Sequence, residues 1–154
     1  MIVRVVVAVV LTAALVAVSM PAVSTVRIDA ADGHIDRQLT ALGERLRTMV
    51  ATNDPTTGPG ARHVTELTLP ARTVTSAAVT RLRLGTRAGA GVASWRVRDA
   101  STDRKRLAGV PIRGTDGGNF TLREPGTHRL VFGLRRQSNR TVVTVGRLGG
   151  TTDA

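Results

Sequence analysis

The chain has 154 residues, a mass of 16.2 kDa and a formal net charge of +11. This length fits one domain, and an apolar content of 42% is enough to build a packed core. The absence of cysteine excludes disulfides, thiolate metal sites and cysteine nucleophiles. There is no tyrosine, and one tryptophan with two phenylalanines offers little surface for base stacking. Nucleic acid is therefore not expected as a partner.

Residues 5–23 form an almost unbroken run of Val, Ala and Leu, with Thr12 and Ser19 as polar exceptions and Pro21 near the end. A helix of this length reaches about 28 Å, close to the roughly 30 Å of a bilayer's hydrocarbon core. No charged residue interrupts the run. We therefore interpret residues 1–27 as an N-terminal membrane anchor or signal segment, and predict that residues 5–23 contact the lipid bilayer.

Three forms of this segment remain open. Arg4 and the small residues at 22–24 fit a cleaved secretory signal with a cut after Ser24, which predicts a secreted protein. The run is longer than the apolar part of most signals, which favours a retained single-pass anchor in the cell membrane. A processed prepilin signal would place Gly before the run and Glu five residues into it, and neither is present. The short basic N-terminus favours a C-terminal domain outside the cell.

Residues 28–52 have the spacing of an amphipathic helix. Apolar residues recur at intervals of three and four, and Pro55 ends the pattern. This stripe can pack on the protein's own β-domain or associate with helices of neighbouring membrane proteins. Residues 53–62 are rich in Pro, Gly and Thr and predict a linker. The stripe consists of Ile35, Leu39, Leu42, Leu46 and Met49.

Residues 63–148 predict a β-rich domain, and residues 149–154 a flexible tail. About seven short strands without intervening helices indicate an antiparallel sandwich or barrel, so the predicted fold class is α+β. Trp95 alternates with small and branched residues and is expected in the core, and Pro111 suggests an edge strand. The expected strands lie within residues 64–69, 79–84, 93–97, 107–112, 120–122, 130–135 and 142–145.

The search for catalytic, cofactor and metal motifs is negative. The single lysine, Lys105, is not in a phosphate-binding loop, and no nucleophile elbow occurs. His34, His63 and His128 are far apart and lack metal-ligand spacing. We therefore predict a protein that is not an enzyme and has no cofactor.

The arginines and two asparagines are the remaining candidates for a site. Alternation places Arg side chains in stripes on predicted strands, and such stripes attract acidic surface polymers or anionic headgroups. Asn119 and Asn139 each begin an Asn-x-Thr triplet at a predicted turn and are candidate glycosylation sites. The candidate anion-binding residues are Arg81, Arg83, Arg96, Arg98, Arg104, Lys105 and Arg106.

The order of apolar helix, amphipathic continuation, linker and β-domain resembles the layout of type IV pilin-like and pseudopilin proteins. The segments MIVRVVVAVVLTAALVAVSMPAV, LPARTVTSAAVTRLRLG, VASWRV and REPGTHRLVFGLRR resemble an uncharacterised family of small haloarchaeal single-span membrane proteins associated with pilus-assembly genes. The resemblance implies a structural or accessory component of a cell-surface assembly, with envelope or pilus-assembly proteins as partners. The alternative is a secreted module, released after Ser24, that binds anionic polymer or glycan through an Arg-rich face.

Overall fold

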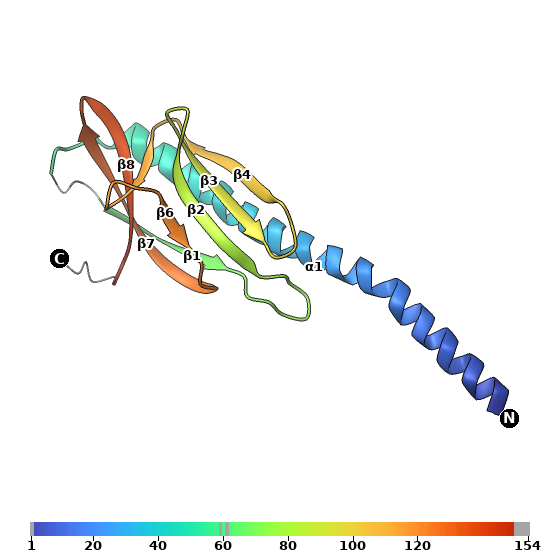
Figure 1. Ribbon diagram of the computed structural model, residues 1–154. Coiled ribbons are helices and arrows are strands. Elements are labelled where there is room, and N and C mark those ends of the chain that lie inside the picture. Colours follow the sequence, from blue (N-terminus) through green and yellow to red (C-terminus); the bar gives the residue numbers. More distant parts are fainter. Residues whose placement is uncertain (1, 59, 61, 150–154) are drawn as a thin grey trace.

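The computed structural model describes residues 2–58, 60 and 62–149, and for residues 2 and 18–22 only the backbone. In this part of the chain one long helix precedes eight strands, which confirms the α+β class (Figure 1). Of the predicted tail, residues 150–154 lie outside the description. The elements are α1 (Ile2–Thr52), β1 (Arg62–Leu69), β2 (Val79–Arg87), β3 (Ala90–Val97), β4 (Thr102–Ala108), β5 (Ile112–Gly114), β6 (Phe120–Leu122), β7 (Gly126–Gln137) and β8 (Arg140–Arg147).

The strands form two separate four-stranded sheets, and the described strands close no barrel. Sheet A has the order β1-β7-β8-β5, and sheet B the order β4-β3-β2-β6. All strand pairs are antiparallel except β5 with β8, where Ile112 lies opposite Val143 in a parallel register. The expectation of an entirely antiparallel fold is wrong at this pair, because the chain crosses from sheet B and joins the edge of β8 in the same direction.

Two of the hairpins have the two-residue loops that are most common between antiparallel strands. Ala88 and Gly89 connect β2 to β3 with φ values of 49° and 78°. Ser138 and Asn139 connect β7 to β8 with φ values of 47° and 61°. Positive φ at both central residues is the mark of a type I′ turn, whose twist matches that of the strands. The turn predicted at Asn139 is confirmed.

One predicted strand is wrong. The structure has no single strand over residues 107–112; β4 ends at Ala108, and β5 begins at Ile112. Gly109, Val110 and Pro111 separate them, since Pro111 has no N–H for a ladder. β4 itself was not expected, because its sequence TDRKRLA lacks apolar alternation over most of its length.

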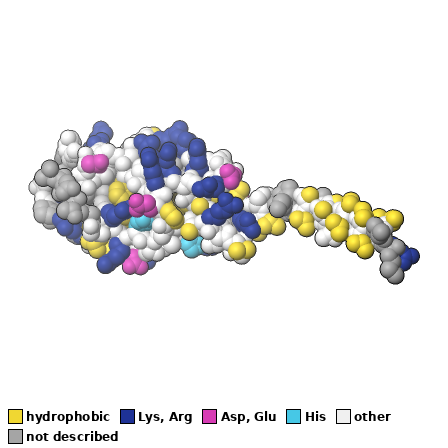
Figure 2. All heavy atoms as spheres, turned by 60° about the horizontal axis from the view of Figure 1, so that its bottom comes forward, with side chains coloured by type: hydrophobic (Ala, Val, Ile, Leu, Met, Phe, Trp, Pro, Cys, Tyr) yellow, Lys and Arg dark blue, Asp and Glu magenta, His cyan; other side chains and the backbone are white. Residues whose placement is uncertain are grey.

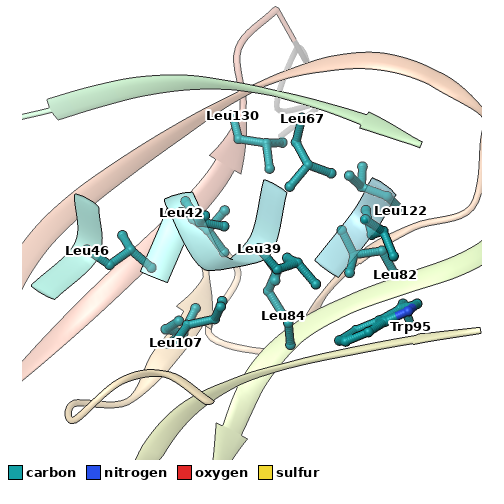
Figure 3. Close-up of a cluster of buried hydrophobic side chains, with 14 of the residues drawn as sticks. Leu39, Leu42, Leu46, Leu67, Leu82, Leu84, Trp95, Leu107, Leu122 and Leu130 are labelled. Carbon is teal, nitrogen blue, oxygen red and sulfur yellow. The ribbon is translucent and has the colours of Figure 1, made fainter. Parts of the chain in front are cut away.

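The C-terminal half of α1 closes the open side of the sandwich. β1 and β4 are the edge strands of the two sheets on this side, and α1 packs against both. The predicted apolar stripe of α1 is fully buried, which shows packing on the protein's own β-domain. In Figure 3, Leu39 and Leu42 of α1 lie between Leu67 and Leu130 on one side and residues of sheet B on the other.

Polar contacts hold the helix against both edges. The side-chain amide of Gln38 donates from Nε2 to the carbonyl of Thr68 at 2.9 Å, and its Oε1 accepts the N–H of Thr68 at 2.8 Å. The amide thus takes the place of a neighbouring strand at the free edge of β1. On sheet B, the indole N–H of Trp95 donates to Asp32 Oδ1 at 2.6 Å. Trp95 is only 3% exposed, so its predicted core position is confirmed.

Candidate functional site

The outer face of sheet B carries a group of arginines that three strands bring together. Arg83 lies opposite Ser94, and Ser94 lies opposite Arg104, so one row crosses β2, β3 and β4. In the next row Arg81 lies opposite Arg96. Their side chains point outward because the alternate positions on β2 and β3 are buried in the core. We call Arg81, Arg83, Arg96, Arg104 and Arg106 the arginine face.

Two of the predicted anion-binding residues lie outside this face. Lys105 is opposite Ala93, a buried position, and its side chain turns toward α1. Its ammonium group forms a 2.6 Å ion pair with Asp36 Oδ1 and donates to Thr40 Oγ1 at 2.6 Å. Lys105 therefore fastens β4 to the helix. Arg98 follows the end of β3, where its backbone N–H donates to the carbonyl of Ala78.

A polar hollow lies beside Arg83 and Arg104 of the arginine face. The hollow has a volume of about 270 Å³ and is lined by Arg83, Arg87 and Arg104 together with Ser94 and Asn119. No carboxylate lines it, and within the described part of the chain none of these arginines forms an ion pair. Guanidinium groups beside hydroxyl and amide groups can bind phosphate, sulfate or carboxylate groups.

The two candidate glycosylation sites have different surroundings. Asn139 is exposed in the β7–β8 turn. Asn119 lies just before β6, and its side-chain amide lies directly over the Cα atom of Gly85 on β2. A residue with a Cβ atom at position 85 would overlap this amide, so only glycine fits there. This contact holds Asn119 against the sheet at the rim of the arginine face. Asn119 is also exposed, but this contact restricts how its side chain can turn toward a glycosylating enzyme.

The structure does not gather the three histidines. His63 lies opposite Phe132 and His128 opposite Leu67, which separates them by four residues, or about 13 Å, along the β1–β7 ladder. His128 is nearly buried, and its Nε2 donates to the carbonyl of Glu124 at 2.8 Å. Among the described residues, no group of three or more His, Asp or Glu side chains could hold a metal ion.

The N-terminal half of α1 projects away from the sheets (Figure 1). Its apolar side chains are exposed on all sides, and Figure 2 shows them along the projecting part of the molecule, while Lys and Arg side chains are concentrated on the body. Within the residues that the structure describes, no helical segment is both long and apolar enough to cross a membrane. The exposed residues include Val3, Val5, Val6, Val7, Val9, Val10, Leu11, Leu15 and Val16.

A comparison with protein families gives one match over residues 2–148, which include the helix and both sheets. The chain belongs to the DUF7311 family, a domain of unknown function. Neither the curated proteins nor the solved structures contain a match. The sequence resemblance to an uncharacterised family over nearly the whole chain is therefore confirmed.

Proposed function

We propose that the protein is a non-enzymatic, membrane-anchored component of a cell-surface assembly, structural or accessory in role, with its β-domain outside the cell. One observation carries the proposal: a single helix packs one face on the body over its C-terminal half and exposes apolar side chains over its N-terminal half. Exposed apolar surface of this extent is rare on soluble monomers and marks a surface that a membrane or a partner covers.

The length and charge of the projecting segment fit a bilayer. The proposed span runs from Val5 to Val23 and includes residues 18–22, whose side chains lie outside the described part of the chain. Arg4 precedes this run and Arg27 follows it, so the nearest charges fall at its two ends. Burying a charge at the centre of a bilayer costs several kcal/mol, and this sequence avoids that cost.

The layout also supports a role in an assembly of the pilin-like kind. An apolar half-helix that continues into a helix packed on a β-domain is the arrangement that the sequence resemblance implies. Such a helix can contact copies of itself or other single-span proteins within the membrane while the body lies outside. We infer envelope or pilus-assembly proteins as its partners.

Membrane fractionation of the C-terminally tagged full chain, with protease added to intact cells, tests the anchor. The proposal predicts a full-length chain in the membrane fraction and a tag that the external protease removes. A tag protected in intact cells, or a truncated chain in the medium, would contradict it. Crosslinking in intact cells tests the assembly, because recovery of no envelope or pilus component would count against that role.

A second candidate, a secreted module released after Ser24, rests on the arginine face. Cleavage there would keep every buried α1 residue in the described core, which begins at Ala31, so the body would remain folded. Intact-mass measurement distinguishes the two candidates, because this one predicts a mature chain that starts at Thr25. Its binding to an anionic polymer such as heparin would weaken in R83A/R104A more than in the charge-matched control R113A/R140A, since Arg113 and Arg140 lie outside the face.

A further inference from the structure

The loop between β1 and β2, residues 70–78, lies where the projecting half of α1 leaves the body. The N–H of Ala77 donates to the carbonyl of Arg27 on α1 at 3.0 Å, and the N–H of Val79 donates to the carbonyl of Pro70 at 3.0 Å. Thr73 and Ser76 close the tip through a 2.9 Å backbone hydrogen bond. The loop is therefore fastened to the helix and folded back on itself.

The tip of this loop presents an apolar side chain to solvent. Val74 is 80% exposed, although Val is among the residue types most often found buried. Beside it, Val23 and Val26 of α1 are 46% and 65% exposed. These valines, with Arg27 and Thr75, line one apolar hollow of about 320 Å³. The apolar surface of the projecting helix thus continues onto the loop.

The β1–β2 loop lies at the level along α1 where the surface of the proposed membrane would be. Nineteen residues from Val5 to Val23 span about 28 Å of helix, which matches the hydrocarbon thickness of a bilayer. A bilayer around this segment would end near Val23, beside the loop tip. The loop would then lie in the headgroup region, where apolar side chains can enter the boundary with the acyl chains and basic side chains are attracted to anionic headgroups.

Cationic groups surround this apolar patch. Arg72 is exposed in the loop itself, and Arg98 is exposed at the adjoining end of β3, where its N–H bonds to Ala78. The Nε atom of Arg27 is buried and has no hydrogen-bond partner in the described part of the chain. Valines flanked by arginines suit an anionic membrane surface, because such a surface attracts basic residues.

We propose that the β1–β2 loop is a second membrane contact, in which Val74 enters the boundary between headgroups and acyl chains while Arg72 and Arg98 bind the phosphates of anionic lipids. This inference rests on the proposed membrane anchor and adds to it a defined partner surface of the body. The contact would hold the base of the body on the bilayer, next to the point where α1 enters.

The absence of cysteine allows a direct test with single-cysteine variants of the full chain. Val74→Cys and Ala88→Cys, each carrying a nitroxide label, are reconstituted in vesicles of phosphatidylglycerol and phosphatidylcholine. Ala88 is the matched control because it is an exposed aliphatic residue in the β2–β3 turn, at the opposite end of β2. We expect accessibility to an aqueous nickel reagent to be several-fold lower at position 74 than at position 88, and accessibility to oxygen to be higher.

Flotation of the same vesicles separates this inference from the anchor on which it rests. A chain that floats with the vesicles but shows equal aqueous accessibility at both positions overturns the loop contact and leaves the anchor standing. A chain that does not float overturns the anchor and the loop contact together. The arginine contribution is tested in the Val74→Cys background: R72Q/R98Q should raise the aqueous accessibility of the label, and R113Q/R140Q should leave it unchanged. An equal effect of both pairs would refute the headgroup contact.

Discussion

Replacing Leu39 by alanine tests whether the buried half of α1 is part of the core. Leu39 is 0% exposed and lies between the two sheets, so its loss leaves a cavity that its neighbours fill only in part (Figure 3). Buried Leu→Ala changes cost 2–5 kcal/mol, and full burial at the centre of the stripe predicts about 3 kcal/mol here. With a urea dependence of about 1.5 kcal/mol per molar, the unfolding midpoint should fall by about 2 M.

The assay is urea unfolding of the full chain in detergent micelles, followed by the fluorescence of Trp95, which α1 covers. Leu15→Ala is the matched control, because it is the same substitution in the same helix at a residue that is 69% exposed and outside the body. It should change the stability of the body by less than about 0.5 kcal/mol. Equal losses in both variants, or a loss below about 1 kcal/mol for Leu39→Ala, would refute the proposed role of the stripe.

Three further changes test other contacts. Gln38→Ala removes both hydrogen bonds to the edge of β1 and should lower the free energy of unfolding by about 1–3 kcal/mol in the same assay. Gly91→Ala places a methyl group 2.5 Å from a buried side chain of β5 and should cost about 1–3 kcal/mol, whereas Gly109→Ala meets open space and should be near neutral. In a eukaryotic secretory host, Asn139→Gln should remove the glycan mass and Asn119→Gln should leave it; the reverse result would contradict the difference in their surroundings.

Local periodicity was sufficient to predict the helix and most strands. The spacing of Ile35, Leu39 and Leu42 identified the face of α1 that is buried, because apolar residues at helical spacing share one face; what covers that face was not decided by the spacing. The β7–β8 turn was also predictable, since its turn residues sit between two alternating segments. In both cases the residues that decide the structure are neighbours in the sequence.

β4 could not be predicted because most positions on its core-facing side are polar. The exposed Asp103 lies opposite the buried Trp95, and the half-buried Lys105 opposite the buried Ala93, so on this side only Leu107 is a buried apolar residue. Lys105 can occupy this position because its ammonium group forms an ion pair with Asp36 and a hydrogen bond with Thr40, which are far away in the sequence. Without β4, the row of Arg83 and Arg104 could not be assembled either. The parallel pairing of β5 with β8 is likewise a long-range contact that leaves no local pattern.

The position of the predicted linker bears on how an anchor in α1 would act on the body. The predicted Pro/Gly linker, residues 53–62, follows the C-terminal end of α1 and is therefore on the far side of the body from the projecting half. Between that half and the body the helix is continuous, and three side chains fix it to the strands: Asp32, Asp36 and Gln38. Because contacts on both edges prevent the helix from rolling, the direction in which α1 enters a bilayer also sets the orientation of both sheets. A body held in this way would turn the β1–β2 loop toward the membrane in every copy of the chain.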